Sequence, residues 1–317
     1  MKIFTWHIHG TYLYYLSQCN ATFYIPVRPQ QDEGYYGRGE TFPFGANVVE
    51  IAVSEIGAAT FDLILFQTNK NYLEDQYEIL TAEQRSLPRV YIEHDPPRQH
   101  PVNTRHIVQD PDVLLVHVTA FNALMWDNGR AAVTVIDHGV KVRAVPYLGV
   151  IPKGIVMVNN FASRGRLLGL DLFYKVREQI PLDLIGMNSE EAGGLGEVLH
   201  PDLPEFLSAY RFFFNPIRYT SLGLSVCEAM TLGLPVAGLA TTEMVTVIKN
   251  GVNGFLETSI DKLISSMKRL LDDADLARRL GESGKAEALK RFSINRFVSD
   301  WELVFKRQLN HAAPYSE

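Results

Sequence analysis

Short apolar runs alternate with polar or helix-forming segments through the first half of the chain. Most of these runs are rich in β-branched and aromatic residues, and several are almost continuously apolar. Such runs are typical of strands that are buried on both faces of a parallel sheet. The strands predicted in this half are residues 2–7, 22–27, 62–67, 89–93, 113–118 and 132–136.

The second half repeats the same alternation. Its predicted strands are residues 154–159, 182–187, 210–214 and 235–240, with helical segments between them. Strands that alternate with helices in this way indicate doubly wound α/β domains. The segment 145–153, VPYLGVIPK, contains two prolines and a glycine and is the predicted hinge. We therefore expect one domain over residues 1–150 and a second over residues 151–295.

The C-terminal part of the chain has the periodicity of amphipathic helices. Apolar side chains recur there three and four positions apart, which predicts one buried stripe on each helix. The first stripe consists of Ile260, Leu263, Ile264, Met267, Leu270 and Leu271. The second begins after Ser293, a residue suited to cap a helix, and consists of Ile294, Phe297, Val298, Trp301, Val304 and Phe305. We expect both stripes to belong to the core.

Composition and charge narrow the range of functions. The 317 residues are 46% hydrophobic and 21% charged, as in a globular protein, and the net charge of −6 comes without a basic stripe. A nucleic-acid partner is therefore not expected. Cys19 and Cys227 lack metal-ligand spacing and fit a reducing compartment, so we expect a cytoplasmic location. No apolar run is long enough to span a bilayer, although peripheral membrane contact through a lipid-linked acceptor stays open.

One long segment, residues 28–46, has no clear periodicity. It contains four glycines, two prolines and four aromatic residues. Long irregular connections in compact domains are often functional, and Tyr35 and Tyr36 could stack on an acceptor. A surface loop folded on its own aromatic side chains explains the composition equally well.

Residues 210–255 combine the features of a phosphate site. The predicted strand 210–214 leads through a loop with Ser221 and Gly223 into a short helix that carries Glu228. Free N–H groups and the helix dipole favour an anion at such a helix N-terminus. The carboxylate of Glu228, one turn later, could bind both hydroxyls of a ribose. The segment therefore predicts a nucleotide-diphosphate site.

The same segment carries the motif Gly223-Leu224-x-x-x-Glu228-Ala229-Met230-x-x-Gly233-x-Pro235, followed by Thr242-Glu243 and Gly251-Val252-Asn253-Gly254-Phe255. It resembles the donor domain of glycosyltransferase family four. The resemblance implies a GT-B fold, two Rossmann-like domains facing across a cleft, with a last helix over residues 296–317 that crosses back to the first domain. It also implies retaining transfer of a sugar from a nucleotide-diphosphate sugar to an unknown acceptor, without a metal or other cofactor.

In that family the counterpart of Glu228 binds the ribose. Donor-binding residues implied by the resemblance are Gly10, Thr220, Ser221, Leu222, Gly223, Leu224, Ser225 and Glu228. Thr220 stands where the family has a second glutamate that contacts the transferred sugar. Leu168 stands at the place of a phosphate-binding lysine, and the nearby Arg164 and Arg166 are the predicted substitutes, because guanidinium groups bind phosphate oxygens in bidentate fashion.

Further candidates lie at the ends of two strands in the first half. Gly10 permits close approach of the backbone to a ligand. His94, in the sequence Glu93-His94-Asp95-Pro96-Pro97, resembles a histidine that related enzymes direct at the donor sugar, and Asp95 could either orient this imidazole or only fix the turn. A metal site at His7 and His9 is not predicted, because no third ligand is spaced to complete it.

Two alternative functions stay open on the sequence. One is a non-catalytic relative that binds a nucleotide sugar, which Thr220 and Leu168 favour. The other is a sugar-nucleotide epimerase, which needs no acceptor. Fold analogy does not decide among these three functions.

Overall fold

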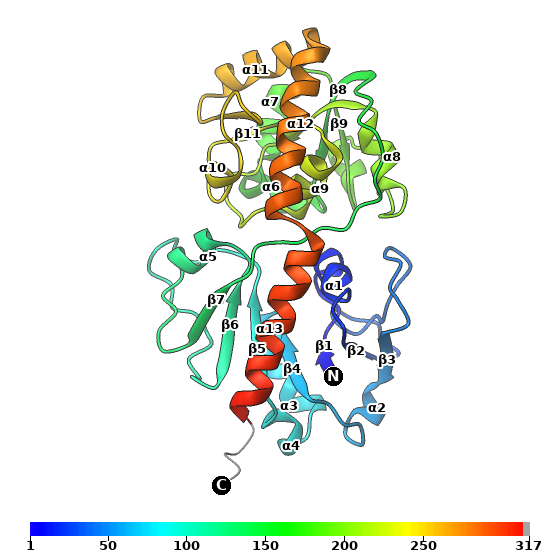
Figure 1. The fold of residues 1–317 in the computed structure, drawn as a ribbon, viewed down its shortest axis with the longest axis vertical. Helices are drawn as coiled ribbons and strands as arrows, with labels where there is room; N and C mark the ends of the chain where they lie inside the picture. Colours follow the sequence, from blue (N-terminus) through cyan, green and yellow to red (C-terminus); the bar gives the residue numbers. More distant parts are fainter. Residues whose placement is uncertain (313–317) are drawn as a thin grey trace. The chain divides into compact units, whose positions relative to one another are not determined.

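The computed structural model describes residues 1–312. They form two compact units, of which the first consists of Met1–Gly139 and helix α13 (Ile294–Ala312) and the second of Val140–Ser293. Each unit contains one sheet, and every pairing between the strands is parallel (Figure 1). The alternating pattern of the sequence therefore predicted the architecture correctly.

The first sheet has the strand order β3-β2-β1-β4-β5-β6-β7. Because the chain moves from β1 to one edge and then returns to β4, the order reverses between these two strands. Its strands are β1 (Lys2–Thr5), β2 (Thr22–Val27), β3 (Val48–Ala52), β4 (Leu63–Phe66), β5 (Arg89–Glu93), β6 (Val113–His117) and β7 (Ala132–Val135).

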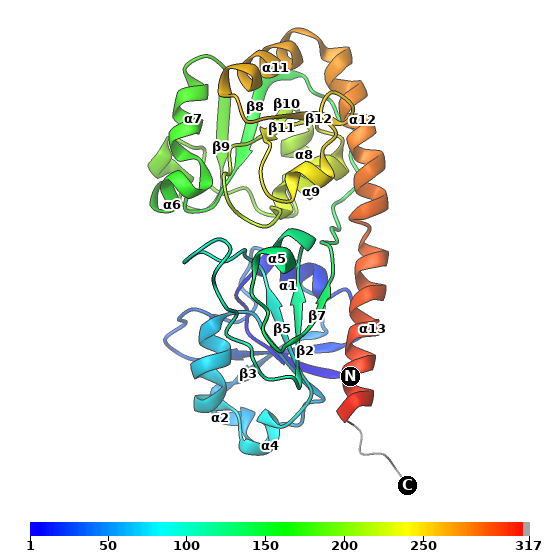
Figure 2. The ribbon, with the colours of Figure 1, turned by 90° about the vertical axis from the view of Figure 1, so that its left-hand side faces the viewer.

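Helices cover both faces of this first sheet, with α13 on one side and α2 and α4 on the other (Figure 2). Within the unit α13 packs beside α1, where Trp301 Nε1 donates a hydrogen bond to Tyr12 Oη over 3.2 Å. The predicted stripe of α13 is thus part of the core. Besides α13, the helices are α1 (Gly10–Leu16), α2 (Val53–Ile56), η1 (Asn71–Asp75), α3 (Gln76–Ile79), α4 (Ala82–Arg85) and α5 (Ala120–Met125).

The second sheet has the order β12-β11-β10-β8-β9. The chain runs from β8 outward to β9 and then crosses back to β10, so the order reverses between β8 and β10. Its strands are β8 (Ile151–Met157), β9 (Leu182–Ile185), β10 (Tyr210–Asn215), β11 (Val236–Leu239) and β12 (Gly254–Glu257).

The connection from β8 to β9 and the connection from β10 to β11 move toward opposite edges of the sheet. Because both crossovers are right-handed, their helices α7 and α9 lie on opposite faces of this sheet. Helix α11 buries Leu263, Ile264 and Met267 in the same core cluster as Phe173 of α7. The helices of the unit are α6 (Phe161–Leu168), α7 (Leu170–Arg177), η2 (Ser189–Ala192), α8 (Leu203–Ser208), α9 (Leu224–Leu232), α10 (Met244–Val247), α11 (Ile260–Asp272) and α12 (Ala274–Arg291).

The boundary between the units differs from the expected one. We expected it after residue 150, but the second unit begins at Val140, whose N–H donates to Phe292 O over 3.0 Å. The predicted hinge is also folded into this unit, because Leu148 N and Gly149 N both donate to Ser208 O and β8 begins at Ile151. The prolines and the glycine of this segment therefore belong to a folded connection that leads into β8, and not to a linker between the units.

Among the described residues, no helix combines the length and the apolar character that crossing a membrane requires.

Candidate functional site

The carboxyl edge of the second sheet, between β8 and β10, is the place where an open α/β fold offers a ligand site. Loops that follow neighbouring strands diverge where the strand order reverses, and ligands bind in the crevice between them. Here the two segments are the helix pair α6–α7, which follows β8, and the loop from Pro216 to Gly223, which follows β10. Both carry residues predicted to bind the donor.

These two segments are in direct backbone contact. Arg218 N donates to Leu167 O over 3.2 Å. Gly169, between α6 and α7, has φ +89°, and a Cβ atom there would lie 2.1 Å from Pro216 O. Because any larger residue would be strained and would collide with the backbone, Gly169 fixes the distance between the two segments.

The N-terminus of α9 is suited to bind an anion. Its N-cap residue is Gly223, which has no side chain to occupy the amides of the first turn. Gly223, Leu224 and Ser225 are partly exposed, whereas Ser221 and Leu222 are buried, and Thr242 Oγ1 donates to Ser221 O over 3.3 Å. A ligand can therefore reach the first turn of α9, whereas the buried Ser221 and Leu222 anchor the loop that precedes it.

Glu228 lies one turn into α9 and is only 4% exposed. Its Oε1 is 3.8 Å from Nε2 of His200, a largely buried residue in the segment before α8. Burial lowers the pKa of His200, which favours the neutral imidazole. His200 was not predicted from the sequence, because a single histidine 28 positions before Glu228 has no recognisable spacing.

The predicted arginines both lie on α6, which is broken at Gly165 (φ 52°, ψ −131°). The Arg166 side chain is 76% exposed, and its Nη1 is 2.6 Å from Oδ2 of Asp171 on α7. Leu168, at the place of the expected lysine, is only 2% exposed and belongs to the core cluster of Phe161 and Phe173. Leu168 therefore contributes to the packing of the core. Any positive charge that binds a phosphate at this edge must come from neighbouring residues.

One cation at this edge was missed in the sequence. Arg218, two positions before the partly buried Thr220, binds Asp171 with both Nη atoms, over 2.6 and 2.8 Å. Its position two residues before Thr220 was the only signal in the sequence, since the contact with Asp171 spans 47 residues.

Other parts of the resembling motif have structural roles. The Glu243 carboxylate is buried and pairs with Arg291 Nη2 of α12 over 2.7 Å. Asn253 Oδ1 accepts a hydrogen bond from Lys249 N over 2.7 Å, and its Nδ2 donates to Val247 O over 3.1 Å. These contacts hold the turns after β11 in place. They account for the presence of Glu243 and Asn253 in the motif, and neither residue needs a ligand contact.

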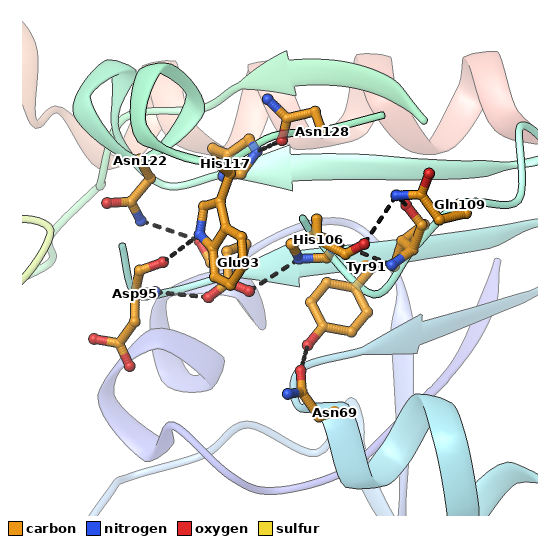
Figure 3. A network of polar contacts seen from close by, with 11 residues as sticks. Asn69, Tyr91, Glu93, Asp95, His106, Gln109, His117, Asn122 and Asn128 are labelled. Carbon is orange, nitrogen blue, oxygen red and sulfur yellow. Dashed lines mark hydrogen bonds and ion pairs between the residues drawn. The ribbon is translucent and has the colours of Figure 1, made fainter. Parts of the chain in front are cut away.

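In the first unit, a polar network anchors the turn that carries His94 (Figure 3). Glu93 Oε1 accepts a hydrogen bond from Asp95 N over 2.9 Å, and Glu93 Oε2 is 3.0 Å from His106 Nε2. Trp126 Nε1 donates to Asp95 O over 2.9 Å. The residues on both sides of His94 are therefore fixed by the side chains of Glu93 in β5, of His106 in the loop that follows, and of Trp126, directly after α5.

His94 itself packs among aromatic rings. Its ring centroid lies 3.9 Å from that of His9 and 4.7 Å from that of Tyr12. Burial, followed by the proximity of His9 and His138, holds the pKa of His94 well below its usual value. Within residues 1–312 its buried Nε2 has no hydrogen-bond partner. Asp95 does not orient this imidazole, because its carboxylate pairs with Arg98 over 2.6 Å.

The structure separates the two tyrosines predicted to bind an acceptor. Tyr35 is completely buried, with Trp6 Nε1 3.3 Å from its hydroxyl and the Arg28 guanidinium 3.7 Å from its ring centroid. Its ring is part of the core and is not available for stacking, which corrects the prediction. Tyr36 is 38% exposed and lies beside His7. The segment 28–46 thus packs largely on its own aromatic side chains and on neighbouring residues of the first unit.

Gly10 begins α1, where the chain leaves β1. A Cβ atom at this position would lie 2.4 Å from Cε2 of Phe42 and 2.9 Å from Nε2 of His7. A larger residue here would therefore have to displace the rings of Phe42 and His7, whatever ligand the loop binds. In the part of the chain that the structure describes, no three His, Cys, Asp or Glu side chains form a group that could hold a metal ion.

The buried histidine at the end of β6 predicts acid sensitivity. Burial lowers the pKa of His117 to about 4, while in the unfolded chain the residue has the ordinary pKa of a histidine, 6.5. As the pH falls from 7 to 5 the unfolded chain gains a proton that the folded chain does not, so the free energy of unfolding falls by about 2 kcal/mol from this residue alone. Urea denaturation at both pH values measures the loss.

Replacing His117 with glutamine should remove that part of the pH dependence, whereas the same change at the exposed His100 should leave it intact. An identical pH dependence in His117→Gln and the native protein would contradict the assignment.

Residues 169–273, which lie within the second unit, match the protein family described as Glycosyl transferases group 1. A segment of 130 residues, 38% of the chain, is 32% identical to a sucrose synthase of Melioribacter roseus, of which it covers only 16%.

Solved structures resemble nearly the whole chain. Sucrose-phosphate synthase from Thermosynechococcus elongatus superposes with a TM-score of 0.73 over 99% of this chain and 100% of that one, at 16% identity. Anabaena HepE in complex with UDP superposes with a TM-score of 0.68 over 97% of this chain and 100% of that one, also at 16% identity. At this identity the likeness concerns the fold, which is GT-B with two Rossmann-like domains.

Proposed function

We propose that this chain is a glycosyltransferase that moves a sugar from a nucleoside diphosphate sugar to an acceptor whose identity stays open. One observation carries the proposal: at the β8–β10 edge, the uncapped N-terminus of α9 and the carboxylate of Glu228 lie one helical turn apart. The family match over residues 169–273 and the GT-B fold support it.

In the proposed mechanism the donor is held by its nucleotide. Glu228 accepts hydrogen bonds from the ribose hydroxyls, and the first-turn amides of α9 bind the diphosphate. Donors that are already in place stabilise the charge that develops on the leaving group, which is often the largest contribution to catalysis. Arg164 and Arg166 add positive charge on the α6 side, so the proposal needs no metal ion.

We further propose that transfer retains the anomeric configuration. The bond from the anomeric carbon to the phosphate oxygen breaks while the bond to the acceptor oxygen forms on the same face. The departing phosphate oxygen takes the acceptor's proton, so no protein base is required. A role of His94 toward the sugar rests on the family resemblance alone.

Thr220 and Leu168 favour a second candidate, a protein that binds a nucleotide sugar without turning it over. Thr220 carries no charge to offset a developing oxocarbenium ion, and Leu168 contributes no cation. This candidate shares the nucleotide site with the enzyme and differs from it only in turnover.

A thermal-shift screen tests the shared nucleotide site. UDP is the first probe, because the HepE structure contains it. A ligand at a hundred times its Kd stabilises the folded protein by about 2.7 kcal/mol, which raises the Tm by several degrees. We expect one nucleoside diphosphate to give this shift and its free nucleoside to give much less. Equal Tm values with all nucleoside diphosphates and without ligand would refute the proposal.

A further inference from the structure

An ion-paired triad joins the two segments of the candidate donor site. The carboxylate of Asp171, on α7, binds the guanidinium of Arg218 through both oxygens, over 2.6 and 2.8 Å. The same carboxylate binds Arg166 Nη1 over 2.6 Å. Two cations thus share one anion, which leaves a net positive charge beside the β8–β10 edge.

Arg218 makes more hydrogen bonds than Arg166 and is less exposed. Its Nη1 also donates to Arg166 O over 2.7 Å, its backbone N–H donates to Leu167 O, and its side chain is 25% exposed against 76% for Arg166. Pairing with Arg218 is the main reason that the pKa of Asp171 is lowered, so the carboxylate stays ionised at neutral pH. The guanidinium is therefore held in one orientation before any ligand binds.

Part of the hydrogen-bonding capacity of Arg218 stays available. Within residues 1–312, its contacts use both N–H groups of Nη1 and one of Nη2, and neither Nε–H nor the second Nη2–H has an acceptor. A guanidinium group with adjacent donors and partial exposure matches the geometry of phosphate oxygens.

Position adds a second argument. Arg218 lies in the loop that ends at the uncapped N-terminus of α9, whereas the position of the expected lysine, Leu168, is buried in the core. Arg218 is thus the cation nearest in sequence to the proposed diphosphate site. It belongs to the loop after β10 and not to the turn between α6 and α7.

We propose that Arg218 binds the diphosphate of the donor and that Asp171 is a positioning residue that orients its guanidinium. This inference rests on the proposed function and names a contact that the resemblance did not supply. The competing explanation is a purely structural clamp, in which Arg218 only ties the β10 loop to α7.

Isothermal titration of UDP and UMP separates the two explanations. We expect Arg218→Gln to weaken UDP binding about tenfold or more, because a charge-assisted contact is lost, and to weaken UMP binding less. Asp171→Asn keeps the guanidinium but no longer orients it, so it should weaken UDP binding less than Arg218→Gln while still lowering the ratio of UDP to UMP affinity. Lys175→Gln, on the exposed side of α7, is the matched control for net charge.

Equal losses of UDP affinity in Arg218→Gln and Asp171→Asn, with an unchanged ratio of UDP to UMP affinity, would establish the clamp and overturn the inference while the proposed function stands. If Arg218→Gln does not fold, Arg218→Lys is measured in its place, with a smaller reduction of the same ratio expected and an unchanged ratio overturning the inference. A native protein that binds no nucleoside diphosphate would overturn the proposed function and this inference together.

Discussion

Replacing Glu228 with glutamine should weaken the binding of UDP by about tenfold to a hundredfold, since hydrogen bonds to a charged group contribute about 1.5–3 kcal/mol each. The carboxylate of Glu228 is buried one turn into α9, where the proposed ribose would use both of its oxygens. Glutamine has nearly the same shape as glutamate. The loss of UDP affinity therefore measures the contribution of the negative charge and of the second acceptor oxygen. Isothermal titration measures it.

A ligand control distinguishes this role from a structural one. The native protein should prefer UDP to 2′-deoxy-UDP, and Glu228→Gln should lose most of this preference because the hydroxyl has no carboxylate to bind. Glutamine at Glu282, on the exposed side of α12, is the control variant. A Glu228→Gln protein that folds normally and still binds UDP as tightly as the native one would exclude the ribose contact.

Restoring the lysine of the resembling family at Leu168 should destabilise the protein and should not improve nucleotide binding. The side chain lies in the core cluster of the second unit, with Phe161 and Phe173. Placing an ammonium group there should cost about 3 kcal/mol or more, because a buried charge needs a partner. The free energy of unfolding, measured by urea denaturation, reports this loss.

The conservative control at this position is Leu168→Met, which keeps the volume and should cost less than about 1.5 kcal/mol. A Leu168→Lys protein of native stability that binds UDP more tightly would show that this side chain reaches the ligand. In that case the core position of Leu168 would be the wrong explanation for the absent lysine.

The sheets were predictable because their central strands are apolar on both faces. Both strands that the sequence did not reveal, β3 (Val48–Ala52) and β12 (Gly254–Glu257), lie at sheet edges. An edge strand has one neighbour and admits polar residues, as Glu50 in β3 shows. β12 also begins within a glycine-rich turn, which hides its periodicity.

The candidate site was predictable only in part, for a related reason. Glu228 and Gly223 stand in one continuous segment, so local sequence reveals the helix N-terminus and the carboxylate together. Arg218 and His200 acquire their neighbours only through the fold, Arg218 from Asp171 and His200 from Glu228. Tyr35 shows the opposite error, because an aromatic residue in an aperiodic loop gives no sign that it points into the core.

The central claim is tested most directly by measuring the release of nucleoside diphosphate from the sugar nucleotide that gives the largest thermal shift. We expect the native protein to release the nucleoside diphosphate together with the free or transferred sugar, and Glu228→Gln to release much less at the same donor concentration. Tight binding of the donor with no release under any acceptor condition, or conversion of the donor to an epimer, would contradict the claim that this chain is a glycosyltransferase.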